Sequence, residues 1–201
     1  MRRGFKFELK PNGMQIQLMK QFCGCARYVY NRTLSLEKSL YKKDSKHSFK
    51  YTEAAKRLPE WKKKNPFLKE CHSQVLQQSL KDLDQAYTNF FRKQANFPRY
   101  KKKFQHDSIR FPQGVELDEA KQLIRLPKIG WMGYRKSRDI IGTIKNVTVS
   151  RRGEKWDVSI QTEYEVDSSA PNPSEIGIDM GVNDNVPVLL QQSSFACRTA
   201  L

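Results

Sequence analysis

The sequence predicts an α+β protein, with a helical N-terminal half, a set of short strands, and one further strand that is flanked by glycines. Three observations support this class. Apolar residues recur at spacings of three and four up to about residue 93, they alternate with polar residues from Ser108 onward, and a single acidic residue, Asp179, stands between Gly177 and Gly181 in an apolar run. A chain of 201 residues can hold two small folded units and a fragment.

The N-terminal part is expected to begin with a strand over residues 5–9, followed by a turn at Pro11-Asn12-Gly13. A long amphipathic helix should come next, because apolar positions recur every three or four residues from Phe22 to Leu40. A shorter helix is expected from Thr52, as its N-cap, to a stop at Pro59. Residues 61–66 are expected to be a basic connector.

The clearest helix is predicted from Ser73 to about Lys93, because leucines and aromatic residues form one apolar stripe along it. Amide and basic side chains occupy the opposite side, at Gln74, Gln78, Lys81 and Gln85. Glutamine can bond adenine at two points in the major groove, and lysine can reach guanine or phosphate. The polar stripe therefore indicates either a DNA-reading face or an ordinary solvated helix face.

From Ser108 onward the sequence predicts short strands at residues 109–111, 115–117, 123–126, 140–144 and 147–149. A hairpin should join residues 147–150 to residues 156–164 through Gly153, since glycine supplies the positive φ of a tight turn. Several short strands at this density favour a small barrel. Residues 167–174 contain two prolines and few apolar residues, which is typical of a linker before the glycine-flanked strand.

The net charge is +16, and the basic residues are spread over predicted helices and loops. This distribution favours a folded basic surface that binds nucleic acid over a disordered basic arm. The alternative is a basic protein whose charge serves only solubility. No apolar run is long enough to span a membrane, and the N-terminus lacks the apolar segment of a signal peptide, so we expect no membrane partner and a cytoplasmic location.

The cysteines lack the spacing of a zinc site, and no histidine completes one, so we expect reduced thiols and no zinc; they are Cys23, Cys25, Cys71 and Cys197. Asp179 is the candidate catalytic and Mg²⁺-binding residue, because a carboxylate in an apolar strand is costly unless it meets a cation. Two-metal phosphodiester chemistry needs at least two more acidic ligands, which the neighbouring residues do not supply. The other interpretation is an aspartate solvated in a turn.

Basic residues alternate with aromatic residues in three clusters, at residues 28–32, 61–64 and 97–104. Such clusters combine phosphate neutralisation with rings that can stack on bases. Three of them in a chain of this charge favour nucleic-acid binding.

Three stretches, residues 25–31, 76–103 and 177–181, carry a resemblance to a known family. With them the chain resembles the N-terminal half of the TnpB family, the OrfB-type proteins of bacterial insertion sequences, which are related to type V CRISPR effectors. The resemblance implies a helical recognition lobe inserted into a small wedge-type β-barrel, followed by an incomplete RuvC-like (RNase H-like) strand. It places the first barrel strand at residues 1–12, the lobe at 13–104, the rest of the barrel at 105–166, a linker at 167–174 and the start of the RuvC-like domain at 175–201.

The resemblance further implies binding of a guide RNA from the same element, a double-stranded DNA target with a short adjacent motif, and Mg²⁺-dependent cleavage in which Asp179 is the first RuvC carboxylate. The candidate nucleic-acid contacts come from the helix stripe, the basic clusters and the resemblance together. They are Arg27, Tyr30, Asn31, Gln74, Gln77, Gln78, Lys81, Arg99, Lys101, Lys102 and Lys103.

After Val182 the sequence departs from the family pattern, which continues with two further acidic residues and a four-cysteine zinc ribbon. We therefore expect a truncated protein that binds RNA and DNA without cleaving DNA by itself, in the nucleoid of a bacterium or archaeon. The alternatives are a guide-RNA-dependent repressor, a nuclease that is active only when the rest of the RuvC domain is supplied elsewhere, and an unrelated RNA-binding structural protein.

Overall fold

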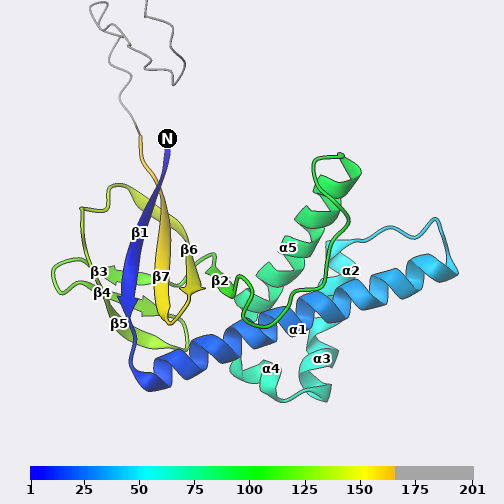
Figure 1. Ribbon diagram of the computed structural model, residues 1–201, viewed down its shortest axis with the longest axis horizontal. Helices are drawn as coiled ribbons and strands as arrows, with labels where there is room; N and C mark the ends of the chain where they lie inside the picture. Colours follow the sequence, from blue (N-terminus) through cyan, green and yellow to red (C-terminus); the bar gives the residue numbers. More distant parts are fainter. Residues whose placement is uncertain (166–201) are drawn as a thin grey trace, which may run out of the picture. The chain divides into compact units, whose positions relative to one another are not determined.

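The computed structural model of the chain describes residues 1–165, which fold into helices and antiparallel strands (Figure 1). This arrangement confirms the α+β class. The elements in chain order are β1 (Arg2–Lys10), α1 (Gly13–Lys43), α2 (Tyr51–Lys56), α3 (Leu58–Lys64), α4 (Phe67–Glu70), α5 (Ser73–Phe91), β2 (Ser108–Phe111), β3 (Glu116–Asp118), β4 (Leu123–Leu126), β5 (Gly130–Tyr134), β6 (Thr143–Arg152) and β7 (Lys155–Glu163).

The strands form one sheet in the order β2-β6-β7-β1-β5-β4-β3, and every pairing in it is antiparallel. Strand β1 lies in the middle of this order, whereas its partners β7 and β5 follow all five helices of the described residues. The helices are therefore inserted between the first strand and the rest of the sheet. Strands β2 and β3 end the order, so the described residues form an open sheet, and the closed barrel predicted from the sequence is not confirmed.

The β6–β7 hairpin is formed as the sequence predicts, with Arg152 opposite Lys155 and a turn that contains Gly153 at φ 61°. Val147 and Val149 pair with Ile160 and Val158, and all four side chains are buried. Alternation along the two strands thus places one apolar face of the hairpin in the core.

Helix α1 begins with a capping box. The Asn12 side chain accepts a hydrogen bond from the Gln15 N–H at 2.8 Å, and the Gln15 side chain accepts one from the Asn12 N–H at 3.0 Å. The same Gln15 side chain donates to the carbonyl of Trp131 in β5 at 2.7 Å. The start of the helix is therefore fixed to the sheet.

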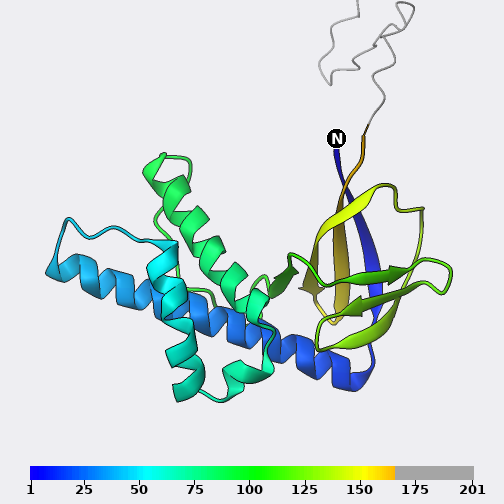
Figure 2. The ribbon, with the colours of Figure 1, turned by 180° about the vertical axis from the view of Figure 1, so that it is seen from behind.

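The main hydrophobic core is continuous from the sheet into the helices, and it includes Phe7 of β1, Phe22 of α1, Leu76 of α5 and Phe111 of β2. Figures 1 and 2 show α1 starting beside the sheet and extending away from it, with α5 packed along it. The two helices approach closely where the buried Ser79 hydroxyl donates to the Ala26 carbonyl at 2.6 Å.

The structure differs from the sequence prediction in the short elements. Residues 61–64, predicted as a connector, belong to α3, and Pro59 lies in the first turn of that helix, where a proline lacks no hydrogen bond, rather than ending the helix before it. Helix α4 and strand β5 were not predicted, and β6 begins at Thr143, so Ile140 and Ile141 lie outside the strands. The predicted linker at 167–174 and strand at 175–182 lie outside the described residues. Within residues 1–165, every helix is too short or too polar to cross a bilayer.

Candidate nucleic-acid interface

The predicted catalytic and metal-binding residue, Asp179, lies outside the described residues, as does Cys197. Residues 1–165 contain no group of three or more His, Cys, Asp or Glu side chains that could hold a metal ion. Cys23, Cys25 and Cys71 are buried free thiols, and burial raises the pKa of Cys23 to about 12. The predicted site residues that lie within residues 1–165 are the candidate nucleic-acid contacts.

The polar stripe of α5 divides into exposed and restrained residues. Gln77 and Lys81 are exposed, and the Lys81 ammonium lies 5.9 Å from the ring centre of Tyr51. Gln78 is half-buried and donates to the Asp82 carboxylate at 3.0 Å, and Gln74 is half-buried as well. Gln77 and Lys81 are therefore the α5 residues that present their polar groups to a ligand most freely.

Tyr30 and Arg27 lie on α1, and both have protein partners. Tyr30 is 5% exposed and packs with Leu34, Leu83 and Tyr87 in a second, smaller hydrophobic cluster. Burial raises the pKa of its hydroxyl above the usual range, and the Asp82 carboxylate raises it further. A ring buried in this way supports packing, and stacking on a base would require it to leave the cluster.

The Arg27 guanidinium forms an ion pair with Asp107 at 2.8 Å, and both side chains are largely buried. This pair fastens α1 to the loop that leads into β2. The predicted role of Arg27 in phosphate binding would have to compete with that carboxylate.

Asn31 and Lys101, which the sequence predicts separately, meet directly in the structure. The Asn31 amide donates to the Lys101 carbonyl at 2.9 Å and accepts from the Lys101 N–H at 2.8 Å. The Lys101 ammonium lies 4.3 Å from the Tyr30 ring centre and 3.8 Å from the Asp82 carboxylate. Asn31 therefore fixes the backbone at residue 101, and Lys101 turns its charge toward the protein.

Residues 99–103, called the basic segment below, carry four exposed basic residues, and besides Lys101 they are Arg99, Lys102 and Lys103. Within residues 1–165, none of the three has a carboxylate at ion-pair distance. Between them, the Tyr100 ring lies 4.6 Å from the ammonium of Lys38 on α1. The segment thus combines a backbone held at residue 101 with side chains that remain available to phosphates.

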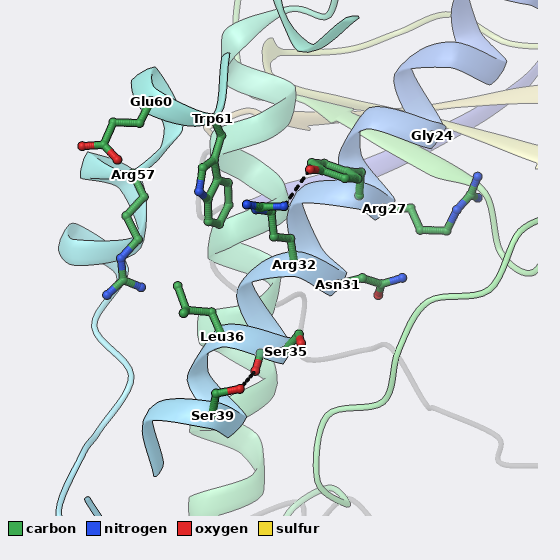
Figure 3. A pocket seen from close by; sticks show the side chains of 11 residues that line it. Gly24, Arg27, Asn31, Arg32, Ser35, Leu36, Ser39, Arg57, Glu60 and Trp61 are labelled. Carbon is green, nitrogen blue, oxygen red and sulfur yellow. Dashed lines mark hydrogen bonds between the residues drawn. The ribbon is translucent and has the colours of Figure 1, made fainter. Parts of the chain in front are cut away.

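A groove of about 890 Å³ lies between α1 and α3 (Figure 3). The guanidinium of Arg32 lies 5.3 Å from the Trp61 ring centre and 5.8 Å from that of Tyr28, and it donates to the Tyr28 hydroxyl at 3.0 Å. Arg57, on the α3 side of the groove, is paired with Glu37 at 2.9 Å. The residues that line the groove are Gly24, Arg27, Tyr28, Asn31, Arg32, Ser35, Leu36, Ser39, Arg57, Glu60 and Trp61.

Arg32 was not among the residues selected from the sequence, although it belongs to one of the three basic, aromatic clusters. The available signal was its spacing of four from Tyr28, which places both side chains on one face of α1. The contact with Trp61 depends on the packing of α3, which was predicted as a connector. The groove could therefore not be assembled from the sequence.

Comparison with known proteins shows the family. Residues 1–46 match the helix-turn-helix domain family of IS605-type OrfB proteins. Over these residues the structure contains β1 and the single continuous helix α1, so the part that it describes does not form two helices joined by a turn.

Two curated relatives match nearly the whole chain. InsQ of Escherichia coli (strain K12), named as a putative RNA-guided DNA endonuclease, is 49% identical over 183 residues, which are 90% of this chain and 45% of InsQ. A protein of Streptomyces pristinaespiralis with the same functional name is 32% identical over 192 residues, which are 92% of this chain and 47% of that protein. The chain spans about half the length of these relatives, and it belongs to the TnpB family, the OrfB-type proteins of bacterial insertion sequences.

Proposed function

We propose that residues 1–165 are a nucleic-acid-binding module of an RNA-guided DNA endonuclease, which holds a guide RNA and contacts the DNA target. In this proposal cleavage depends on Mg²⁺ and on residues outside the described part, including Asp179. Three findings support it: the names of the relatives, the net charge of +16, and the exposed cations of the basic segment.

The observation that carries the proposal is the way in which the basic segment is fixed. Asn31 holds the backbone at residue 101 with two hydrogen bonds, and Lys101 faces Asp82 and Tyr30. Lys102 and Lys103 follow directly and remain exposed without a carboxylate partner in residues 1–165. A cation on an ordered backbone loses less freedom on meeting a phosphate than one on a mobile loop, so this arrangement favours binding of the polyanion.

Contact with double-stranded DNA is assigned to α5 in the same proposal. Gln77 and Lys81 are exposed on it, one turn apart, whereas the Gln78 amide is bonded to Asp82. An exposed glutamine can bond adenine at two points, and the lysine can reach a neighbouring base or phosphate. These are the residues of α5 best placed to read a short motif beside the target.

The experiment compares two double charge reversals in the full chain, measured by fluorescence anisotropy with a single-stranded RNA. Replacing Lys102→Glu and Lys103→Glu should lower the affinity about tenfold or more, and should reduce the slope of log affinity against log salt by about 1.4 for two lost phosphate contacts. The matched control, Lys10→Glu with Lys20→Glu, makes the same charge change at two exposed lysines outside the segment. Equal losses in both proteins would contradict the assignment of the surface.

The same assay tests whether Asp179 contributes to RNA binding. Asp179→Ala should keep the RNA affinity of the unaltered chain within about twofold, because the proposal places the RNA contacts in residues 1–165. A loss of RNA binding as large as that of the lysine pair would show that the binding surface extends through Asp179.

A further inference from the structure

Arg32 differs from the other arginines of the groove in its partners. Arg27 and Arg57 are paired with Asp107 and Glu37, whereas Arg32 is exposed and has no carboxylate at ion-pair distance within the described residues. Its charge is held by the faces of Trp61 and Tyr28 instead, a weak interaction that leaves the hydrogen-bonding edges of the guanidinium largely unused. A guanidinium in this state is available to an anion.

The surroundings restrain Arg32 before any ligand arrives. Trp61 is 6% exposed, so its ring is fixed by the core of the helices, and the Arg32 guanidinium lies over it. The hydrogen bond to the Tyr28 hydroxyl fixes the guanidinium at a second point. Restraint of this kind reduces the entropy lost on binding, and the planar group matches the geometry of a phosphate.

We propose that the groove between α1 and α3 binds a single-stranded RNA segment, with Arg32 as the residue that takes one of its phosphates; this inference rests on the proposed nucleic-acid-binding function. Ser35 and Ser39 line the same groove and are exposed, and hydroxyl groups beside a phosphate can bond the 2′-hydroxyl of RNA. The outer face of the Arg32 guanidinium can also stack on an unpaired base, as arginine does in single-stranded RNA recognition.

Glu60 gives the inference a second test. It is exposed and lines the groove opposite α1, yet it forms no ion pair within residues 1–165. A carboxylate near a bound phosphate repels it, so Glu60→Gln should raise the RNA affinity, by about twofold to threefold for one exposed charge. A fall in affinity for this variant would contradict the groove as the RNA site.

The main experiment measures the affinity of full-chain variants for a labelled single-stranded RNA and for a single-stranded DNA of the same sequence. The measurement is repeated at several salt concentrations. Arg32→Met retains an apolar cover on Trp61 but removes the charge, and it should lower the RNA affinity about tenfold and the salt slope by about 0.7. Arg32→Lys should restore the slope but only part of the affinity, since the ammonium lacks the planar fork. The matched control is Arg138→Met, at an exposed arginine on the loop before β6 with no ion pair in residues 1–165, and it should leave both quantities within about twofold.

The outcomes separate the two proposals. If the unaltered chain binds no RNA, the proposed function fails. If it binds RNA and Arg32→Met binds equally well, the inference alone is overturned. A loss for Arg32→Met that is larger on RNA than on DNA supports the site, whereas an equal loss on both overturns its assignment to RNA. A parallel thermal unfolding curve for Arg32→Met that matches the unaltered chain shows that the loss does not come from unfolding.

Discussion

At the scale of single residues, the neighbourhood of Lys128 and His72 shows how the excess of positive charge affects stability. The Lys128 ammonium donates to the successive backbone carbonyls of residues 69–71, at 2.8, 3.3 and 3.3 Å, and so closes the C-terminal end of α4. The adjacent His72 has a lowered pKa, first because its ring is partly buried and then because Lys128 and Lys62 repel its proton. The neutral form of His72 is therefore the one that the fold favours.

This arrangement predicts a pH dependence of the free energy of unfolding. The pKa of His72 in the folded chain is below the value of about 6.5 for an unfolded chain, so the unfolded chain binds the proton first as the pH falls. The contribution of His72 to stability is complete above about pH 6.5 and is lost as the pH falls through the folded pKa. His72→Gln should therefore reduce the loss of stability between about pH 7 and pH 5, measured by urea unfolding.

The control is His106→Gln, at an exposed histidine of the described residues. It should leave the pH dependence close to that of the unaltered chain. A curve for His72→Gln that falls as steeply toward acid pH as the curve of the unaltered chain would refute this explanation.

The candidate site shows what the sequence reveals about single residues and what it does not. Composition and alternation identified residues 97–104 as a basic, aromatic cluster, and the structure places its four basic residues on the surface. The sequence could not show that Lys101 turns toward Asp82 while Lys102 does not. The difference arises from the Asp82 carboxylate on α5 and the Asn31 amide on α1, which are distant in the sequence. Tyr30 likewise has the chemistry of a stacking residue, and only the packing of α5 against α1 reveals its burial.

At the scale of elements, the accuracy of the prediction follows the strength of the periodic signal. Helix α5 begins at the predicted residue, Ser73, and ends within two residues of the predicted end, because its leucines repeat over several turns. Strand β5 was missed because two of its five residues are glycines, and it forms through pairing with β1 and β4 on its two sides. Tertiary pairing of this kind leaves little trace in the local sequence.

The hydrogen bonds of Asn31 give a testable account of how α1 holds the basic segment. Asn31→Ala removes both side-chain hydrogen bonds to residue 101, so the basic segment should loosen from α1, at a cost of about 1 kcal/mol in the free energy of unfolding. The Lys101 amide should exchange its hydrogen faster, because that N–H loses its acceptor, and RNA affinity should fall about threefold as the cations become mobile. Hydrogen exchange measured at this amide checks the prediction.

Two further variants sharpen this test. Asn31→Asp keeps an acceptor for the Lys101 N–H but loses the donor to its carbonyl, so its exchange rate should be intermediate. Gln85→Ala removes an amide that, within residues 1–165, bonds only to Asn89 on the same helix, and it should leave the Lys101 amide unchanged. If the Lys101 amide were equally protected in Asn31→Ala, the proposed attachment of the basic segment to α1 through Asn31 would be refuted.

At the scale of the whole molecule, the insertion of the helices into the sheet explains why the two parts share one core. Strand β1 lies between β7 and β5, and α1 leaves it directly, so the core residues of the sheet and of the helices are continuous. The α+β class could be predicted from the change of period along the chain, whereas the insertion was inferred from the family resemblance. The open strand order could not be predicted, because it depends on pairings between strands distant in the sequence.

In the proposed arrangement, RNA binds to both the basic segment and the groove between α1 and α3. The most direct measurement is hydrogen exchange of the full chain with and without a single-stranded RNA, followed along residues 1–165. We expect slower exchange at residues 99–104, at residues 31–39 of α1 and at the adjoining α3, and unchanged exchange in the β3–β4 hairpin. Protection confined to the β3–β4 hairpin, with the basic segment and the groove unchanged while RNA is bound, would contradict this arrangement.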